Sequence, residues 1–154
     1  MGNSQFKNFL YTTPDLFSFV HRTNSPDICK RIINEGFLFA DSFHKTTDRL
    51  INDEIYLNYW NLQRKHYGEF VIRIDFSKEL INALQVKFQS VLQSKDVQQF
   101  LAEDLGQNEE DENIFLLPLF YIKGYYDINK NIEVLNPFYN PSFVPLKLLK
   151  ELKK

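Results

Sequence analysis

Residues 16–37 read LFSFVHRTNSPDICKRIINEGF, and this stretch predicts one strand followed by one helix. The strand corresponds to Leu16–Val20, a short apolar run of residues that fit a pleated, partly buried surface. It leads into His21, so we expect the strand to deliver this imidazole at its end. The helix follows directly and has clear signals at both of its ends.

Each end of this helix carries a residue type that favours its position. Ser25 is a good N-cap, and Pro26 suits the first helical position because the N–H that proline lacks would have no partner there. Gly36 is placed to end the helix in the left-handed conformation. Four apolar residues share one face at helical spacing, and we expect the only cysteine among them to be a core residue: Ile28, Cys29, Ile32 and Ile33.

The rest of the chain adds strands and helices outward from this unit. Apolar runs or alternation predict strands at residues 37–43, 69–76, 114–126 and 132–135. Helical periodicity and caps predict helices at residues 46–64, 77–92 and 97–105 and from residue 145 onward. Turn residues 129–131 make the last two strands a hairpin, and residues 106–113 form an acidic, solvated loop.

Composition limits the classes of function. The chain has 154 residues, so we expect residues 1–154 to form a single domain. A net charge of −2 provides no basic field for tight nonspecific binding to duplex DNA. The three histidines lack zinc-ligand spacing and the five glycines do not cluster into a phosphate loop, so we expect no metal and no Rossmann-type turn. Without a signal pattern or a membrane-length apolar run, the expected compartment is the cytoplasm, with no membrane partner.

His21 and Thr23 form the first candidate site. They lie two residues apart on one strand, so their side chains point to the same face. An imidazole and a hydroxyl in this arrangement can hold ribose hydroxyls, although a histidine at a strand end is more often a packing residue. The order His-x-Thr, helix, Gly36-Phe37 resembles the opening of the ADP-ribosyltransferase family. The similar branch is the His-Tyr-Glu type, which includes diphtheria toxin and the poly-ADP-ribose polymerases.

A second stretch, Ile132–Leu135 followed by Val144-Pro145, resembles the catalytic-glutamate strand of the DNA-thymidine ADP-ribosyltransferase toxins. The resemblance implies that Glu133 is the catalytic carboxylate. Breaking the bond between nicotinamide and ribose develops positive charge on the sugar, which a nearby carboxylate stabilises. Taken alone, Glu133 is more simply an exposed strand residue in an acidic protein.

The resemblance also implies an aromatic residue that stacks on the nicotinamide ring. The matching strand position holds Leu38 rather than tyrosine, so the candidates lie further along the chain. We prefer Tyr56, which follows a polar stretch on the predicted helix, over Tyr59 and Tyr67. Stacking of an aromatic ring on a cationic ring contributes about 1 kcal/mol or more when desolvated.

Two further positions affect the expected chemistry. Arg22 stands where the branch usually has glycine, and its backbone would contact the nicotinamide amide. Asn131, two residues before Glu133, stands where arginine-modifying relatives commonly have glutamate, which disfavours arginine as the acceptor. Nucleic-acid bases, other side chains and water remain as acceptors.

Together, these similarities imply an α+β fold of the ADP-ribosyltransferase type, with a split, mostly antiparallel sheet and flanking helices. The implied activity is a toxin-like, mono-ADP-ribosyltransferase reaction, in which ADP-ribose passes from NAD to a protein or nucleic acid and nicotinamide is released. His21, Arg22, Thr23 and Tyr56 would bind NAD as a co-substrate, and His21 and Glu133 would be catalytic. This requires His21 and Glu133 to line one cleft. One alternative is an NAD glycohydrolase. The other is a catalytically degenerate binding or interaction module, and the departures at Arg22 and Leu38 favour this second alternative.

Overall fold

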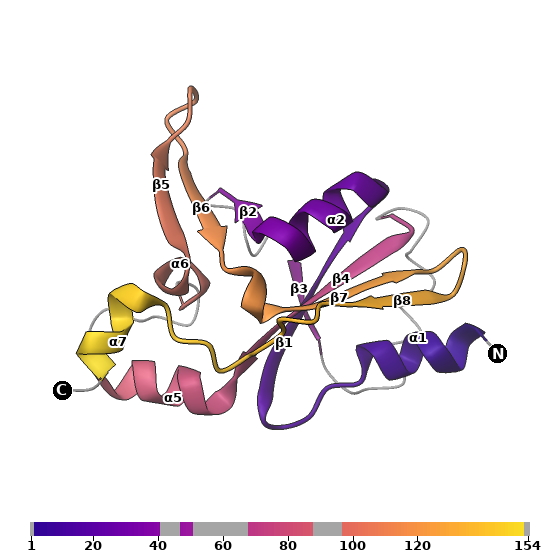
Figure 1. Ribbon diagram of the computed structural model, residues 1–154, viewed down its shortest axis with the longest axis horizontal. Helices are drawn as coiled ribbons and strands as arrows, with labels where there is room; N and C mark the ends of the chain where they lie inside the picture. Colours follow the sequence, from indigo (N-terminus) through magenta and orange to yellow (C-terminus); the bar gives the residue numbers. More distant parts are fainter. Residues whose placement is uncertain (1, 41–46, 51–67, 88–96, 153–154) are drawn as a thin grey trace.

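A computed structural model describes residues 2–40, 47–50, 68–87 and 97–152. In these residues the chain forms an α+β fold with two antiparallel sheets and flanking helices (Figure 1). The elements in chain order are α1 (Gly2–Leu10), β1 (Leu16–Thr23), α2 (Pro26–Glu35), β2 (Phe37–Phe39), β3 (Thr47–Leu50), β4 (Phe70–Ser77), α5 (Lys78–Lys87), α6 (Val97–Leu101), β5 (Glu103–Gln107), β6 (Asn113–Leu117), the 3-10 helix η1 (Leu119–Tyr121), β7 (Ile122–Asp127), β8 (Ile132–Leu135) and α7 (Leu146–Leu152).

The two sheets differ in size. The larger sheet has the strand order β3-β1-β4-β7-β8, and the smaller sheet has the order β2-β6-β5. Residues directly opposite each other on neighbouring strands point to the same face, and successive residues on one strand alternate between faces. The register therefore assigns every side chain of the larger sheet to one of two faces. We call these the α2 face and the α1 face, after the helix that packs against each.

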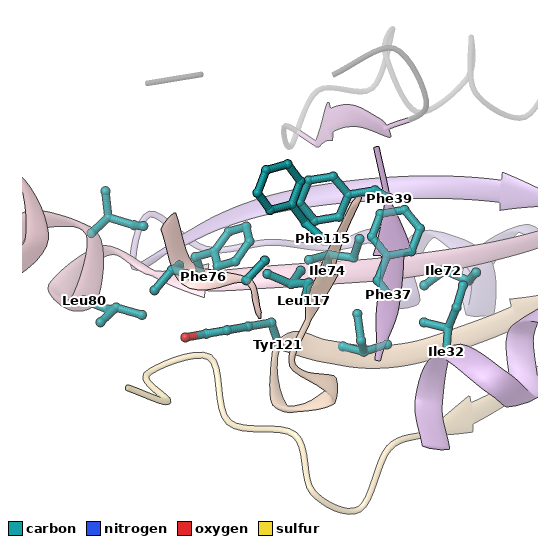
Figure 2. Packing of buried hydrophobic residues seen from close by; sticks show 14 of the residues in the cluster. Ile32, Phe37, Phe39, Ile72, Ile74, Phe76, Leu80, Phe115, Leu117 and Tyr121 are labelled. Carbon is teal, nitrogen blue, oxygen red and sulfur yellow. The ribbon is translucent and has the colours of Figure 1, made fainter. Parts of the chain in front are cut away.

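The α2 face carries the main core. Ile72 and Ile74 of β4 lie on it, together with Phe76, and all three are buried. Side chains from α2, β2 and β6 join them in one apolar cluster, and Figure 2 shows the rings of Phe37 and Phe39 beside these β4 residues. Full burial of one such side chain contributes about 1.5–3 kcal/mol, so this cluster is the largest source of stability in the fold.

The α1 face carries a second, smaller core. Phe6 and Phe9 of α1 pack on Tyr126 of β7, with ring centroids 5.2 and 5.6 Å apart, respectively. Val20 of β1 and Val71 of β4 complete the contact, and neither is exposed to solvent. Figure 1 shows α1 and α2 on opposite sides of the larger sheet. Because helices cover both faces, all residues of β4 after Phe70 are buried.

The strand–helix unit and the final hairpin confirm the sequence predictions. The Oγ atom of Ser25 accepts a hydrogen bond from the N–H of Ile28 at 3.3 Å, as expected of an N-cap. Gly36 ends α2, and its N–H donates to the carbonyl oxygen of Ile32 at 2.9 Å. Its conformation differs from the expected left-handed one, because φ is 107° and ψ is 175°. β7 and β8 form the expected hairpin.

The predictions for three regions are wrong. The helix expected from residue 46 is replaced at its start by β3, which pairs with the free edge of β1 and so satisfies its backbone groups there. The remainder of that prediction lies outside the described residues. The region predicted as the end of a helix and an acidic loop contains β5, which residues 108–112 join to β6. The strand predicted at residues 114–126 is divided by η1 into β6 and β7, which belong to different sheets. β5 is exposed along its whole length, so it lacks the apolar alternation that identifies a strand.

Gly36 provides a test of how α2 joins β2. A Cβ atom at Gly36 would lie 2.4 Å from the carbonyl oxygen of Leu117, whereas one at Gly106 would meet nothing within 4 Å. Both glycines have positive φ, so alanine is strained at either position. We expect Gly36→Ala to lower the free energy of unfolding by about 3 kcal/mol or more and Gly106→Ala by about 1 kcal/mol in urea titrations. Equal losses would show that the contact with Leu117 is unimportant.

Cys29 is the core residue that the sequence predicts, and it is completely buried. Burial raises the pKa of its thiol from 9.0 to about 12, and the charge of Asp127 adds to this shift. The folded state therefore holds the thiol proton more tightly than the unfolded state does. The resulting stabilisation is fully present below pH 9.0 and is lost as the pH rises towards about 12.

This shift predicts a difference between the parent chain and Cys29→Ala at high pH. The free energy of unfolding should fall more steeply in the parent chain between pH 9.0 and about 12, because the variant has no thiol to titrate. Urea titrations across that range measure the two slopes. A folded chain whose Cys29 reacts with a disulfide reagent at pH 8 as fast as the urea-unfolded chain would contradict the burial on which this prediction depends.

Candidate functional site

His21 lies on the α2 face of the larger sheet. It pairs with Ile72 of β4, which pairs in turn with Tyr125 of β7, and Tyr125 pairs with Val134 of β8. The imidazole is half-buried, and its centroid lies 5.1 Å from that of the Phe37 ring. The next residue but one on the same strand points to the same face, as expected. It is Thr23, and its Oγ1 atom accepts a hydrogen bond from the N–H of Ser25 at 3.1 Å.

Glu133 lies on the α1 face. It pairs with Tyr126, which pairs with Val71 of β4, and Val71 pairs with Arg22 of β1. Burial raises the pKa of Tyr126, and the charge of Glu133 raises it further. Burial lowers the pKa of Lys123, and the charge of Arg73 lowers it further. The charge of Glu133 acts in the opposite direction. The electrostatic influence of Glu133 thus falls on residues of the α1 face.

The expectation that His21 and Glu133 line one cleft is therefore wrong. Val134 occupies the β8 position in the row of His21, and Glu133 is its neighbour on the opposite face. Only a shift of β8 by one residue would exchange them. In the observed register the two strands approach closely at Gly124, where a Cβ atom would lie 2.2 Å from the carbonyl oxygen of Val134. Asn136 directly follows β8. Its side-chain amide donates to the carbonyl oxygens of Leu119 and Ile122, which fixes the end of this strand.

Aromatic rings occupy the space on one side of His21. The rings of Phe37 and Phe39 are stacked with centroids 5.9 Å apart, and Phe39 stacks on Phe115 of β6 at 5.4 Å. All three are buried, and Figure 2 shows them as one group at the junction of β2 and β6. This side of His21 is part of the apolar core.

Arg22 does not join His21 and Thr23 on the α2 face. The Arg22 side chain is 8% exposed and points to the α1 face, where Nη1 donates to the carbonyl oxygen of Gly68 at 3.4 Å. Tyr56 lies outside the described residues, as do the alternatives at positions 59 and 67. Leu38 is exposed on β2.

Glu112 is a second carboxylate that begins a late strand. It immediately precedes β6, in the turn between β5 and β6. The β6 residue that pairs with Phe37 is Leu117, five positions further on. A strand advances about 3.4 Å per residue, so Glu112 is about 17 Å away along the strand from the level of His21. It does not complete a site with the imidazole either.

A buried polar cluster on the α1 face was not predicted from the sequence. Arg73 is 1% exposed and Asp75 is not exposed at all, and Nε of the arginine lies 3.0 Å from Oδ1 of the aspartate. Nη1 donates to the carbonyl oxygens of Phe9, at 2.7 Å, and of Tyr11. These carbonyls lie at the C-terminal end of α1, where intrahelical donors are missing. The guanidinium therefore caps the helix and holds it against the sheet.

The aspartate of this cluster has a second partner. The Tyr139 hydroxyl donates to Oδ2 of Asp75. Burial raises the pKa of Tyr139, and the charge of Asp75 raises it further, so the hydroxyl keeps its proton and cannot act as a base at neutral pH. Ser18 accepts from Nη2 of Arg73 at 3.4 Å and shares a 2.6 Å hydrogen bond with Thr12. The cluster connects α1, β1 and β4 with the segment that carries Tyr139.

An open groove lies at the base of the β5–β6 hairpin. Its volume is about 460 Å³, within the range of binding pockets. Burial lowers the pKa of its Lys147, and the charge of Asp104 opposes this effect. The Lys147 amino group donates to the carbonyl oxygen of Ala102. Apolar residues from α6, α7 and the connecting segments form most of the lining, with three charged residues: Leu101, Pro118, Phe143, Pro145, Leu146, Glu103, Asp104 and Lys147.

Comparisons with known proteins do not identify the chain. No protein family, no curated protein and no solved structure matches it. Within the described residues, no group of three or more histidine, cysteine or acidic side chains is placed to hold a metal ion. None of the helices described is both long enough and apolar enough to cross a membrane. The assignment of function therefore depends on the geometry of the residues above.

The buried cluster predicts a large energetic coupling. Arg73→Met leaves Asp75 as a buried charge without its ionic partner, and we expect a loss of about 3–5 kcal/mol in the free energy of unfolding. Asp75→Leu should cost a similar amount, because it leaves the guanidinium unpaired. The double variant should lose less than the sum of the two, since it removes both charges together. Additive losses in urea titrations would show that the two residues act independently.

Proposed function

We propose that this chain is a catalytically inactive, ADP-ribosyltransferase-like module that binds another macromolecule. The observation that carries the proposal is the register across β1, β4, β7 and β8, which separates His21 and Glu133 by the thickness of the sheet. One carboxylate must act beside the ribose that the histidine holds, and Glu133 does not reach it. The division of the strands into two sheets supports the fold part of the proposal.

Two further observations support the loss of catalysis. The buried rings of Phe37 and Phe39 occupy the space next to the imidazole. The Arg22 side chain forms part of the opposite face, so the position that is glycine in the similar enzymes has become a structural arginine here. Both changes favour a module that has kept the scaffold and serves in binding.

Transfer of ADP-ribose from NAD, or hydrolysis of NAD, is the second candidate. It would need another carboxylate on the α2 face, and Asp127 is one. Asp127 and Thr23 are both partners of Phe70, so they lie in one row two strands apart. Oδ1 of Asp127 also accepts from the N–H of Lys130 at 3.1 Å, which explains the residue equally well as part of the hairpin turn.

Release of nicotinamide from NAD tests both candidates. For the inactive module we expect no release above the level of a buffer control, and no rise in melting temperature with excess NAD. A ligand at a hundred times its dissociation constant would stabilise the fold by about 2.7 kcal/mol, so binding would be readily detected.

The variants Glu133→Gln and Asp127→Asn separate the alternatives. If the parent chain releases nicotinamide and Glu133→Gln does not, Glu133 is the catalytic residue and the proposal is overturned. If nicotinamide release is lost only in Asp127→Asn, the second candidate is established instead. Labelled NAD then distinguishes the two reactions, because a transferase labels a macromolecule in cell lysate and a glycohydrolase does not.

A further inference from the structure

The hairpin of β5 and β6 concentrates negative charge. Residues 103–112 contain six carboxylates and no lysine or arginine, while the whole chain has a net charge of only −2. Five of the six are exposed, and the sixth, Glu112, is half-buried. The remainder of the chain is therefore net positive, and the acidic charge is a local feature of this arm. In Figure 1 the arm extends away from the larger sheet.

The groove described above adjoins this charge. Glu103 and Asp104 belong both to the arm and to the lining of the groove. Two leucines beside them present apolar surface to solvent: Leu105 is 49% exposed and Leu146 is 81% exposed. The lining also contains Lys147, which the charges of Asp104 and Glu103 face, but carboxylates outnumber this cation across the groove and the arm. An apolar surface bordered by net negative charge matches a partner that combines cations with large apolar side chains.

We propose that the groove and the acidic arm bind a lysine- or arginine-rich peptide segment of a partner protein. An apolar side chain of the segment occupies the groove against Phe143 and Leu146. Its cations lie beside Glu103 and Asp104 and along the arm. This deepens the proposed interaction role, because it names the kind of partner. Polyanions are disfavoured, since phosphates would face the same six carboxylates.

Side chains rather than backbone groups carry this recognition. In the described part of the chain, β5 pairs with β6 alone, so its outer edge offers backbone groups to a partner strand. However, the β5–β6 register shifts between Asp104 and Gln107, which interrupts a regular ladder. Charged groups on an exposed strand also prevent edge-to-edge association, so the test must separate that role from binding.

Fluorescence anisotropy with a labelled peptide of repeated Lys-Leu-Lys units tests the proposal. We expect binding that weakens at high salt, that falls about tenfold in Glu103→Gln/Asp104→Asn, and that also falls in Leu146→Ser. The side-chain carbonyl of an asparagine at 104 can still accept from the Gly106 N–H, which now donates to the Asp104 carboxylate at 2.8 Å. This hydrogen bond within β5 is therefore preserved. Asp27→Asn/Glu35→Gln, with the same charge change on exposed positions of α2, is the matched control and should bind as the parent chain does.

Three results would overturn the proposal. The first is peptide binding that Glu103→Gln/Asp104→Asn leaves unchanged while the variant self-associates, since this would assign the charges to edge protection alone. The second is equal binding of a peptide with serine in place of leucine, which would show that the groove does not contribute to binding. The third is tighter binding of single-stranded DNA than of the peptide. None of these readouts uses NAD, so failure here is distinguishable from failure of the proposed inactive module.

Discussion

The ion pair between Arg73 and Asp75, buried on the α1 face, determines how the rest of the molecule is arranged. One guanidinium links the central strand to the C-terminal carbonyls of α1, and the aspartate carries that connection on to Tyr139. A buried ion pair contributes little net stability, but removing either partner leaves the other as an unpaired buried charge, which strongly destabilises the fold. With α1 fixed in this way, Val71 and Tyr126 of the α1 face are buried beneath the helix, whereas Glu133 is exposed on the edge strand β8.

Covering both faces of the sheet moves the available binding surface to its periphery. On the α2 face the layer of Phe37, Phe39 and Phe115 is dense, and on the α1 face the helix occupies the space. The β5–β6 arm is exposed along the whole of β5, and the groove lies at its base. The acidic and apolar groups of this region are therefore accessible to another molecule.

The sequence predicted local structure well, because local signals determine it. Ser25 and Gly36 set the ends of α2, and the turn residues after β7 specified the final hairpin. It did not predict which face Glu133 occupies, because a strand alternates with a period of two and its parity depends on pairing with distant strands. β3 and β5 were missed because neither has an alternating apolar sequence, and β5 is paired without a buried face of its own. The ion pair was missed because nothing in β4 indicates that a helix covers its polar side.

The close approach of β7 and β8 at Gly124 has an evolutionary consequence. Any side chain there would push against the main chain at Val134 and separate the final strand from the sheet. Descendants of this chain that keep the hairpin must therefore keep glycine at position 124, whereas position 106, which is open on all sides, is free to drift at the cost of some backbone strain. Among diverging relatives, an invariant residue at 124 beside a variable one at 106 would be a record of packing and not of chemistry.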